Sequence, residues 1–362
     1  MFDINFFRNT IEIKRNIISP KKQYESSEDL FNEFEGFRSK QPYIFNIETT
    51  NNCNMTCKMC PRTRFMNRKV KNINDDQFLT IIDQAKIHNN EEYSKFKKFI
   101  ANEYGILEEE RSENSYYFYV ISKALTLHGY GEPLIDPNIV KRIQQCTDRH
   151  IPTYFSCVPA NININKLIQL MEAGLGYIKF AMDALDDHNQ KRIRGKNSNF
   201  QDSFDSIVEL IEYKKAHPAL QTKIVITMLS FSDSDEQKEV QNQFIELWKN
   251  YPVYAYVKSQ DNKWYYSDNK NFKNRSHYQT QYCEFPWTSL SVMSNGTVVP
   301  CTQDYNAEMN MGNINEQRLE DIWNSEKYTE FRNNHITGNF PEGFKCHSRC
   351  DLPKIYERLI MK

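Results

Sequence analysis

Short apolar segments alternate with longer amphipathic ones through the middle of the chain, and this alternation constrains the fold most. Strands are predicted at residues 43–48, 124–128, 152–156, 177–182, 223–229 and 253–257. Helices are predicted between them, at residues 138–146, 164–173, 204–216 and 236–248. Strands separated by helices of this length are typical of parallel βαβ crossovers. Six units in about 215 residues predict an α/β fold with a partial (β/α)6 TIM-like barrel rather than a closed eight-unit one.

The flanking segments differ from this core in composition. Residues 1–40 are predicted to form a helical N-terminal extension, and residues 41–258 the partial barrel. Residues 88–118 interrupt it as a polar and aromatic insertion, which we expect to be a surface elaboration, with a lid or partner surface as alternatives. Residues 259–282 are interpreted as a linker. Residues 283–362 are predicted to be a small α+β domain, with a hairpin at Asn295–Gly296 and a helix near 319–331.

Charge and hydropathy exclude several classes of protein. Lys and Arg number 46 and Asp and Glu 47, which gives a formal net charge of −1. The chain as a whole is therefore not a basic nucleic-acid binder. It has no run of 18 apolar residues, and its N-terminus lacks the pattern of a secretory signal. We expect a cytoplasmic protein that binds neither nucleic acid nor membrane.

Seven of the nine cysteines fall into two groups, which in a reducing compartment indicates metal binding or catalysis. The other two, Cys146 and Cys157, are expected to pack in the core. The first group, Cys53, Cys57 and Cys60, has C-x3-C-x2-C spacing directly after the first strand. Structural zinc takes four ligands, and no fourth Cys or His lies nearby. An iron–sulfur cubane held by three thiolates leaves one iron open for an exogenous ligand.

The second group contains Cys283, Cys301, Cys346 and Cys350. These cysteines are spread over 68 residues, so they must converge through the fold. Zinc bound by four thiolates and an iron–sulfur cluster both remain possible from spacing alone. His347 is expected to be a surface residue rather than a ligand.

The first cysteine group and its neighbours resemble the radical S-adenosylmethionine (SAM) superfamily. The resemblance is carried by the loop itself, by Gly129-Tyr130-Gly131-Glu132-Pro133 and by residues 180–185 with the Arg194-Gly195 that follows. It implies a [4Fe–4S] cluster whose open iron binds the amino and carboxylate groups of SAM. Two departures stand out: Met59 replaces a frequent aromatic residue, and residues 155–161 lack the usual Thr-Asn-Gly.

The resemblance also implies roles for individual side chains. Glu132 would accept from the ammonium of SAM, and Arg194 would pair with its carboxylate. The cofactor-binding residues so implied are Met59, Gly129, Gly131, Glu132, Ser156, Asp183 and Arg194. Candidates for the base that takes a substrate proton are Tyr130, Asp183 and Arg194.

The C-terminal region resembles the auxiliary-cluster domains called SPASM and, when shortened, twitch. The shared segments are residues 283–287, 294–301, 311–314 and 321–323. Because only four cysteines are present here, the shortened version with one cluster fits better. The resemblance thus implies two [4Fe–4S] clusters in all, one at each cysteine group.

These resemblances imply that a 5′-deoxyadenosyl radical takes a hydrogen atom from the substrate. The shortened domain is similar to that of aminocyclitol dehydrogenases, so our first hypothesis is oxidation of a secondary alcohol on a sugar or cyclitol. The second is a peptide-modifying enzyme that forms thioether or carbon–carbon cross-links or epimerises residues. A non-enzymatic zinc or redox scaffold is the third. A flavodoxin or ferredoxin is the expected electron donor.

Overall fold

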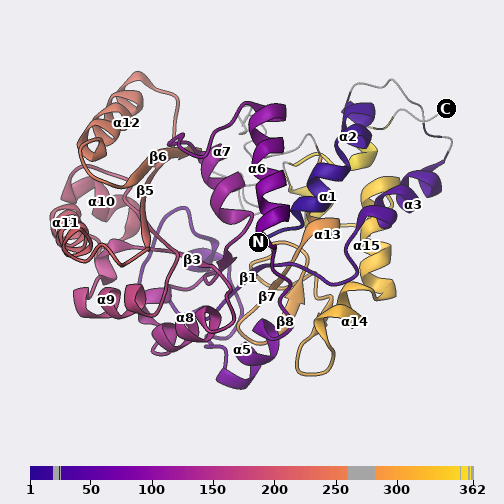
Figure 1. Ribbon diagram of the computed structural model, residues 1–362, viewed down its shortest axis with the longest axis horizontal. Coiled ribbons are helices and arrows are strands. Elements are labelled where there is room, and N and C mark those ends of the chain that lie inside the picture. Colours follow the sequence, from indigo (N-terminus) through magenta and orange to yellow (C-terminus); the bar gives the residue numbers. More distant parts are fainter. Residues whose placement is uncertain (19–23, 25, 260–281, 351, 358, 360–362) are drawn as a thin grey trace.

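One mixed sheet runs through the described part of the chain (Figure 1). The computed structural model describes residues 1–18, 24, 26–259, 282–350, 352–357 and 359. Nearly all of the predicted linker, residues 260–281, lies outside them. The nine strands of the sheet follow the order β6-β5-β4-β3-β2-β1-β7-β8-β9. Every neighbouring pair from β6 to β7 is parallel, and the β7–β8 and β8–β9 pairs are antiparallel.

The first six strands lie close to the predicted segments. They are β1 (Ile44–Ile47), β2 (Leu125–Thr126), β3 (Thr153–Cys157), β4 (Tyr177–Ala181), β5 (Lys223–Ser230) and β6 (Tyr254–Ser259). Side chains alternate between the two faces of each strand. On β4, Ile178 and Phe180 join the main apolar core, whereas Lys179 points to the opposite face, which we call the inner face.

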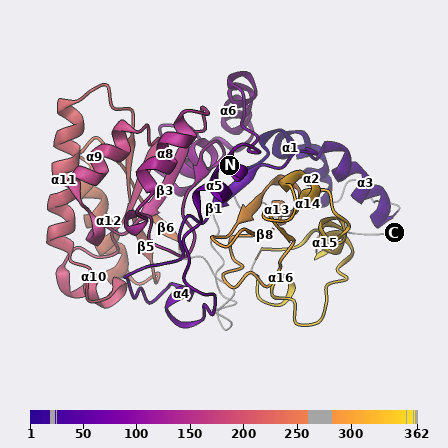
Figure 2. The same ribbon diagram turned by 90° about the horizontal axis from the view of Figure 1, so that it is seen from below.

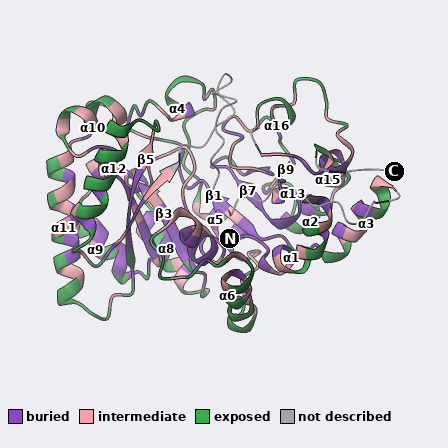
Figure 3. Ribbon diagram, turned by 90° about the horizontal axis from the view of Figure 1, so that it is seen from above, coloured by how far each residue is buried: buried purple, intermediate pink, exposed green. Residues whose placement is uncertain are grey.

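Helices pack on the outer face of the sheet and bury its apolar side chains (Figure 3). They are α5 (Asp75–Ile82), α8 (Ile139–Thr147), α9 (Ile164–Glu172), α11 (Phe200–Ala216) and α12 (Asp235–Trp248). Cys146 and Cys157 both lie in this core, as predicted. A short helix that the sequence reading did not identify, α10 (Asp187–Arg194), follows β4.

One face of the insertion is buried against the N-terminal segment and the sheet, while many of its other residues are exposed. It contains α6 (Asn90–Tyr104), α7 (Glu113–Tyr116) and a π-helical turn, η1 (Tyr117–Ile121). Phe96 of α6 packs against Phe2 and Phe7 of the N-terminal segment. Tyr116 packs against Tyr154 of the sheet. Residues 113–121 therefore cover part of the inner face.

The N-terminal segment is helical, as expected. It contains α1 (Ile4–Asn9), α2 (Ile11–Ile18) and α3 (Ser27–Phe37). Ser26 is the N-cap of α3, where its hydroxyl accepts a hydrogen bond from the backbone N–H of Asp29. Among the described residues, no helix combines the length and apolar character needed to cross a membrane.

The C-terminal part continues the same sheet. Its elements are α13 (Phe285–Thr288), β7 (Leu290–Val292), β8 (Thr297–Val299), β9 (Gly312–Asn313), α14 (Leu319–Trp323), α15 (Glu326–Thr337), α16 (Lys345–Ser348) and η4 (Ile355–Glu357). The predicted hairpin is present between β7 and β8. The single helix predicted near 319–331 is two helices, because Ser325 accepts from the N–H of Tyr328 and starts a new one.

Candidate functional site

The first cysteine group occupies the loop between β1 and α4 (Pro61–Arg64), at the carboxyl end of a parallel strand. The thiols of Cys53, Cys57 and Cys60 pack into one small cluster with the buried side chains of Met55 and Val158. Met59 and Ala160 lie at its edge. The predicted grouping of these three thiols is therefore present in the structure.

Arg194 and Asp183 form an ion pair directly beside this loop. The guanidinium pairs with one carboxylate oxygen of Asp183 and also donates to the Sγ of Cys57 at 3.8 Å. The other oxygen of Asp183 accepts from the backbone N–H of Leu229 at 2.9 Å. Lys58 donates its N–H to the carbonyl of Ile193 at 3.0 Å. Two predicted residues thus act together, and they fix the cysteine loop against α10.

Glu132 is 2% exposed and lies under the loop. Its own N–H donates to the carbonyl of Asn52 at 2.8 Å. Its carboxyl accepts from the N–H groups of Leu134 and Val158 at 3.0 and 2.9 Å. Burial raises the pKa of Glu132 to about 7, because desolvation outweighs these hydrogen bonds. A cationic group placed beside Glu132 would favour its charged form.

The two glycines before Glu132 are required by contacts within the chain. A Cβ on Gly131 would lie 2.1 Å from the carbonyl oxygen of Thr50 and 2.8 Å from that of Asn52. A Cβ on Gly129 would lie 2.7 Å from the Cγ of Glu48. From the sequence, we assigned Gly129 and Gly131 the role of letting the backbone approach SAM. The structure shows that they also allow this segment to pack on the end of β1 and the loop after it.

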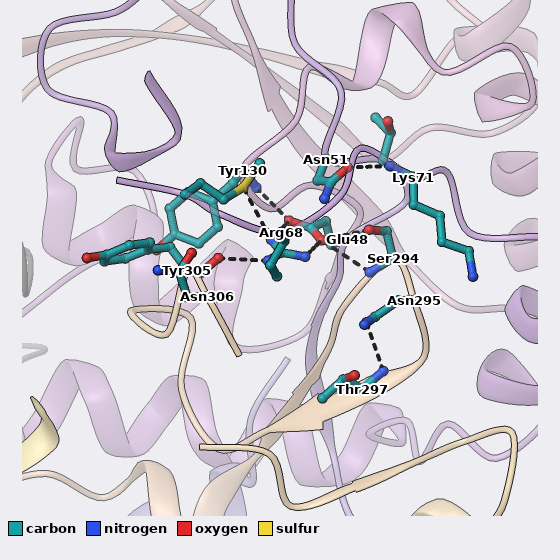
Figure 4. Close-up of polar contacts among 12 residues, drawn as sticks. Glu48, Asn51, Arg68, Lys71, Tyr130, Ser294, Asn295, Thr297, Tyr305 and Asn306 are labelled. Atoms are coloured by element: carbon teal, nitrogen blue, oxygen red, sulfur yellow. Dashed lines mark hydrogen bonds and ion pairs between the residues drawn. The ribbon is translucent and has the colours of Figure 1, made fainter. Parts of the chain in front are cut away.

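A buried carboxylate, Glu48, organises the region between the two cysteine groups (Figure 4). Both of its oxygens accept from Arg68 at 2.7 Å. It also accepts from the N–H of Tyr130 at 3.1 Å, and from the N–H and hydroxyl of Ser294 at 3.1 and 3.0 Å. Arg68 donates further to the carbonyl of Tyr305. We call Glu48, Arg68, Tyr130 and Ser294 the Glu48 network.

Sequence reasoning missed the Glu48 network, although part of its signal was visible. Glu48 is the last residue of the predicted strand 43–48, directly before the cysteine loop. A charged residue at that end of a strand invites a functional or positioning role. Its partners Arg68 and Ser294 lie 20 and 246 residues away along the chain, and no spacing rule predicts them.

The second cysteine group converges, as its spread along the chain required. Cys283, Cys301, Cys346 and Cys350 border one cavity, and each interacts electrostatically with others of the group. The Sγ of Cys346 lies 3.6 Å from the Nε2 of His335. Burial raises the pKa of Cys283 and Cys346 above that of a free thiol. His347 is exposed, as expected, and its Nδ1 lies 2.8 Å from the hydroxyl of Tyr356.

The arrangement of the cysteine side chains can be compared with what a zinc ion and an iron–sulfur cluster each require. Among the described residues, no three His, Cys, Asp or Glu side chains are placed so that they could hold one metal ion. A single zinc draws its ligands together through sulfur bonds of about 2.3 Å. A cubane held by three thiolates takes one at each of three irons and leaves the fourth iron open. Three grouped thiols, buried Glu132 and adjacent Arg194 therefore fit a cluster with bound SAM.

A cavity of about 340 Å³ lies between the inner face of the sheet and the second cysteine group. Tyr130 borders it, and the hydroxyl of Tyr130 donates to the carbonyl of Thr302 at 2.6 Å, one residue after Cys301. The inner face contributes Asn46, Thr126, His128, Tyr154, Lys179 and Tyr256. The cavity thus extends from Gly129 and Tyr130 to the four cysteines.

Ser156 contacts His128, which lines this cavity. The N–H of Ser156 donates to the Nδ1 of His128 at 3.2 Å, so a neutral His128 carries its proton on Nε2. Ser156 is partly exposed at the strand end, where the sequence placed it as a ribose contact. His128 and Lys179 were not among the predicted site residues, although both lie on predicted strands.

The C-terminal region matches a known protein family. Residues 283–351 match the family model described as "SPASM: Iron-sulfur cluster-binding domain". The chain is 46% identical over 50 residues to the S-adenosyl-L-methionine-dependent 2-deoxy-scyllo-inosamine dehydrogenase of Niallia circulans, covering 14% of this chain and 20% of that protein. The chain thus matches only about a fifth of that relative's length.

A second relative matches over most of the chain. It is the tungsten-containing aldehyde ferredoxin oxidoreductase cofactor-modifying protein of Pyrococcus furiosus, which is 22% identical over 354 residues. The match covers 86% of this chain and 89% of that protein.

Solved structures show the same fold at low identity. Streptococcus suis SuiB bound to precursor peptide SuiA has a TM-score of 0.52 and 16% identity, covering 97% of this chain and 83% of that one. The tagged protein anSMEcpe with bound AdoMet has a TM-score of 0.51 and 14% identity, covering 80% and 79%. The complex of BtrN with AdoMet and 2-DOIA is 18% identical and covers 85% and 90%, with a TM-score of 0.46. The family model confirms the predicted resemblance of the C-terminal region to iron–sulfur cluster-binding SPASM domains.

Proposed function

We propose that this chain, which resembles radical SAM enzymes with a C-terminal SPASM domain, is such an enzyme and oxidises a secondary alcohol of a small sugar- or cyclitol-like substrate. The observation that carries the proposal is the cavity. It borders the Gly129–Tyr130 segment on one side and all four cysteines of the second group on the other. A substrate held there contacts the segment that leads into Glu132 and the second cysteine group.

When bound, SAM and the two clusters would supply hydrogen-atom abstraction and electron transfer. The chain's own residues would bind and orient SAM. Glu132 offers a buried carboxyl to the ammonium of SAM, and Arg194 offers a guanidinium beside Cys57 to its carboxylate. Met59 packs beside the thiols, where the predicted adenine contact requires it. These assignments rest on placement beside the first cysteine group.

Oxidation of a secondary alcohol to a ketone removes one hydrogen atom, one proton and one electron from the substrate. The second cysteine group supports the electron step because it borders the cavity. For the proton, Tyr130 is the predicted base that borders the cavity. Its hydroxyl donates to the carbonyl of Thr302, so it must give up that proton before it can accept one from the substrate. We further propose a flavodoxin or ferredoxin as the external electron donor.

The size of the cavity supports a small substrate over a peptide. Small-molecule sites occupy roughly 300–1,000 Å³, and 340 Å³ lies at the lower end of that range. The walls mix tyrosine rings with hydrogen-bonding groups, which suits the alternating apolar and hydroxyl faces of a sugar ring. Peptide modification is the second candidate, and the likeness to SuiB over 97% of this chain favours it.

The function predicts substrate-dependent cleavage of SAM. After anaerobic reconstitution, the chain is incubated with SAM, a strong reductant and a panel of sugars, cyclitols and short peptides. One sugar or cyclitol is expected to increase 5′-deoxyadenosine formation at least tenfold and to yield a ketone. The variant Cys57→Ala is expected to lose the activity, and Cys146→Ala, in the core, to keep it. A peptide product instead of a ketone would establish the second candidate.

Iron content is the control for that experiment. Two cubanes predict about eight irons per chain, and about four after replacement of Cys53, Cys57 and Cys60 by alanine. Four irons that fall to none, together with bound zinc, would show that the second cysteine group is structural. The dehydrogenase would then have no internal electron acceptor, which would contradict the proposal.

The raised pKa of Glu132 predicts that SAM binds more tightly as the pH rises. Below a pKa of about 7 the carboxyl is protonated and neutral, so it accepts from the N–H groups of SAM only weakly until it releases its proton. From pH 6 to pH 8 we expect an approximately tenfold gain in affinity, measured by calorimetry. Glu132→Gln is expected to bind weakly and to lose most of this gain, and the exposed Glu91→Gln to retain it. An unchanged pH profile in Glu132→Gln would contradict the assigned role.

A further inference from the structure

Lys179 is a cation in the cavity that the proposed mechanism does not use. It lies on the inner face of β4, where its backbone pairs with Ser156 of β3 and Val225 of β5. We infer that Lys179 binds an anionic group of the substrate, a carboxylate or a phosphate, so that the enzyme takes an acidic sugar- or cyclitol-like molecule. The inference rests on the proposed function and deepens it.

The alternation of β4 fixes the direction of the Lys179 side chain. Its neighbours Ile178 and Phe180 are fully buried in the core on the outer face. Lys179 must therefore point inward, and it lines the cavity. Asp183, beside the first cysteine group, comes four residues later, which is about 13 Å along an extended chain. Lys179 thus lies deeper than the predicted SAM site.

Aromatic rings surround the ammonium of Lys179. Its Nζ lies 5.5 Å from the ring centre of Tyr116 and 5.6 Å from that of Tyr154. Such contacts stabilise a cation by about 0.5–2 kcal/mol and leave its hydrogen-bond donors available. No carboxylate in the described part of the chain forms an ion pair with Lys179.

The other charged groups of the cavity are already balanced. Lys258 pairs with Glu113 at 3.8 Å. Glu284 pairs with Lys14 at 2.9 Å. Lys179 is thus the charged side chain of the described lining that no carboxylate pairs with.

A lysine without an ion-pair partner in a cavity favours the binding of an anion. Partial burial weakens the hydration of the Lys179 ammonium. An incoming carboxylate or phosphate would neutralise its charge and accept its hydrogen bonds. The same field attracts anionic substrates and repels cationic ones. The tyrosine rings can pack on the apolar face of a sugar ring while the acidic end reaches Lys179.

The test compares acidic and neutral sugars on the reconstituted full chain with SAM present. Calorimetry measures the affinities of D-glucuronate, D-glucose 6-phosphate and D-glucose. We expect at least one acid to bind at least tenfold more tightly than glucose, and the better acid identifies the carboxylate or the phosphate. Lys179→Met is expected to abolish this preference, and Lys179→Arg to retain most of it. Lys223→Met, which removes an exposed lysine on the neighbouring β5, is expected to leave it intact.

Two results would overturn the inference: wild-type protein that binds neither acid more tightly than glucose, or Lys179→Met protein that keeps the preference. If Lys179→Met does not fold, Lys179→Gln replaces it with the same expected loss. Reductive cleavage of SAM is assayed in the same preparations. Cleavage without an anion preference overturns only the role of Lys179, whereas failure to cleave SAM under any condition overturns the proposed function.

Discussion

Gly131→Ala is expected to weaken SAM binding at least 100-fold. The added Cβ would lie 2.1 Å from the carbonyl oxygen of Thr50 and 2.6 Å from its carbonyl carbon. Both atoms belong to the backbone, so no side-chain rotation relieves the clash. The Gly129–Glu132 segment and the cysteine loop must therefore separate. Glu132 then loses the hydrogen bond from its N–H to Asn52 and moves away from the thiols.

Gly36→Ala is the matched control for that variant. Gly36 lies within α3, and nothing lies within 4 Å of the position of its added Cβ. Alanine there is expected to stabilise the protein by roughly 1 kcal/mol, because glycine is a poor helix former. SAM affinity and the denaturation midpoint are measured for both variants. Wild-type affinity in Gly131→Ala would show that the glycine segment does not pack on the loop as described.

Arg68→Met is expected to destabilise the protein by about 3–5 kcal/mol, because it leaves a buried charge unpaired. Glu48 has no exposed surface, and Arg68 supplies both of its charged hydrogen bonds. The donors that remain, the N–H of Tyr130 and the two groups of Ser294, are neutral. The denaturation midpoint measures the effect.

A second substitution separates charge from packing. Glu48→Gln in the Arg68→Met background removes the buried charge and keeps an acceptor for the neutral donors, so we expect it to recover part of the lost stability. Lys95→Ala breaks the exposed pair with Glu91 and should change the midpoint little. If Arg68→Met were as stable as the wild type, the Glu48 network would not hold the two cysteine-bearing regions together.

The sequence was sufficient where periodicity or spacing carries the signal. Strands β4 and β5 are short, mostly apolar runs, and tight cysteine spacing marks the first group. Helix α10 escaped prediction because it has no apolar stripe and is mostly charged or polar. It is held by its cap, where Asp186 accepts from the N–H of Asn189, and by the pairing of Arg194 with Asp183. Neither interaction has a periodic signature.

The packing partners of the insertion were not predictable for a related reason. Its polar residues suggested a solvated surface, yet Phe96, Tyr116 and Phe118 are buried against distant segments. The partners of Phe96 include Phe2, nearly a hundred residues earlier in the chain. An amphipathic pattern shows that a face is buried, but it does not show against what.

The parallel pairing of β1 with β7 determines how independent the two cysteine groups are. Ile44, Asn46 and Ile47 of β1 are in register with residues of β7. The first cysteine group follows β1, and α4 and α16 lie at the same end of the molecule (Figure 2). Backbone hydrogen bonds thus determine the relative position of the two groups, whatever the length of the connecting segment. Strand β7 also covers an edge of β1 that would otherwise invite pairing with another chain. The C-terminal region is accordingly not a detachable module, and its removal would expose the strand that leads into the first cysteine group.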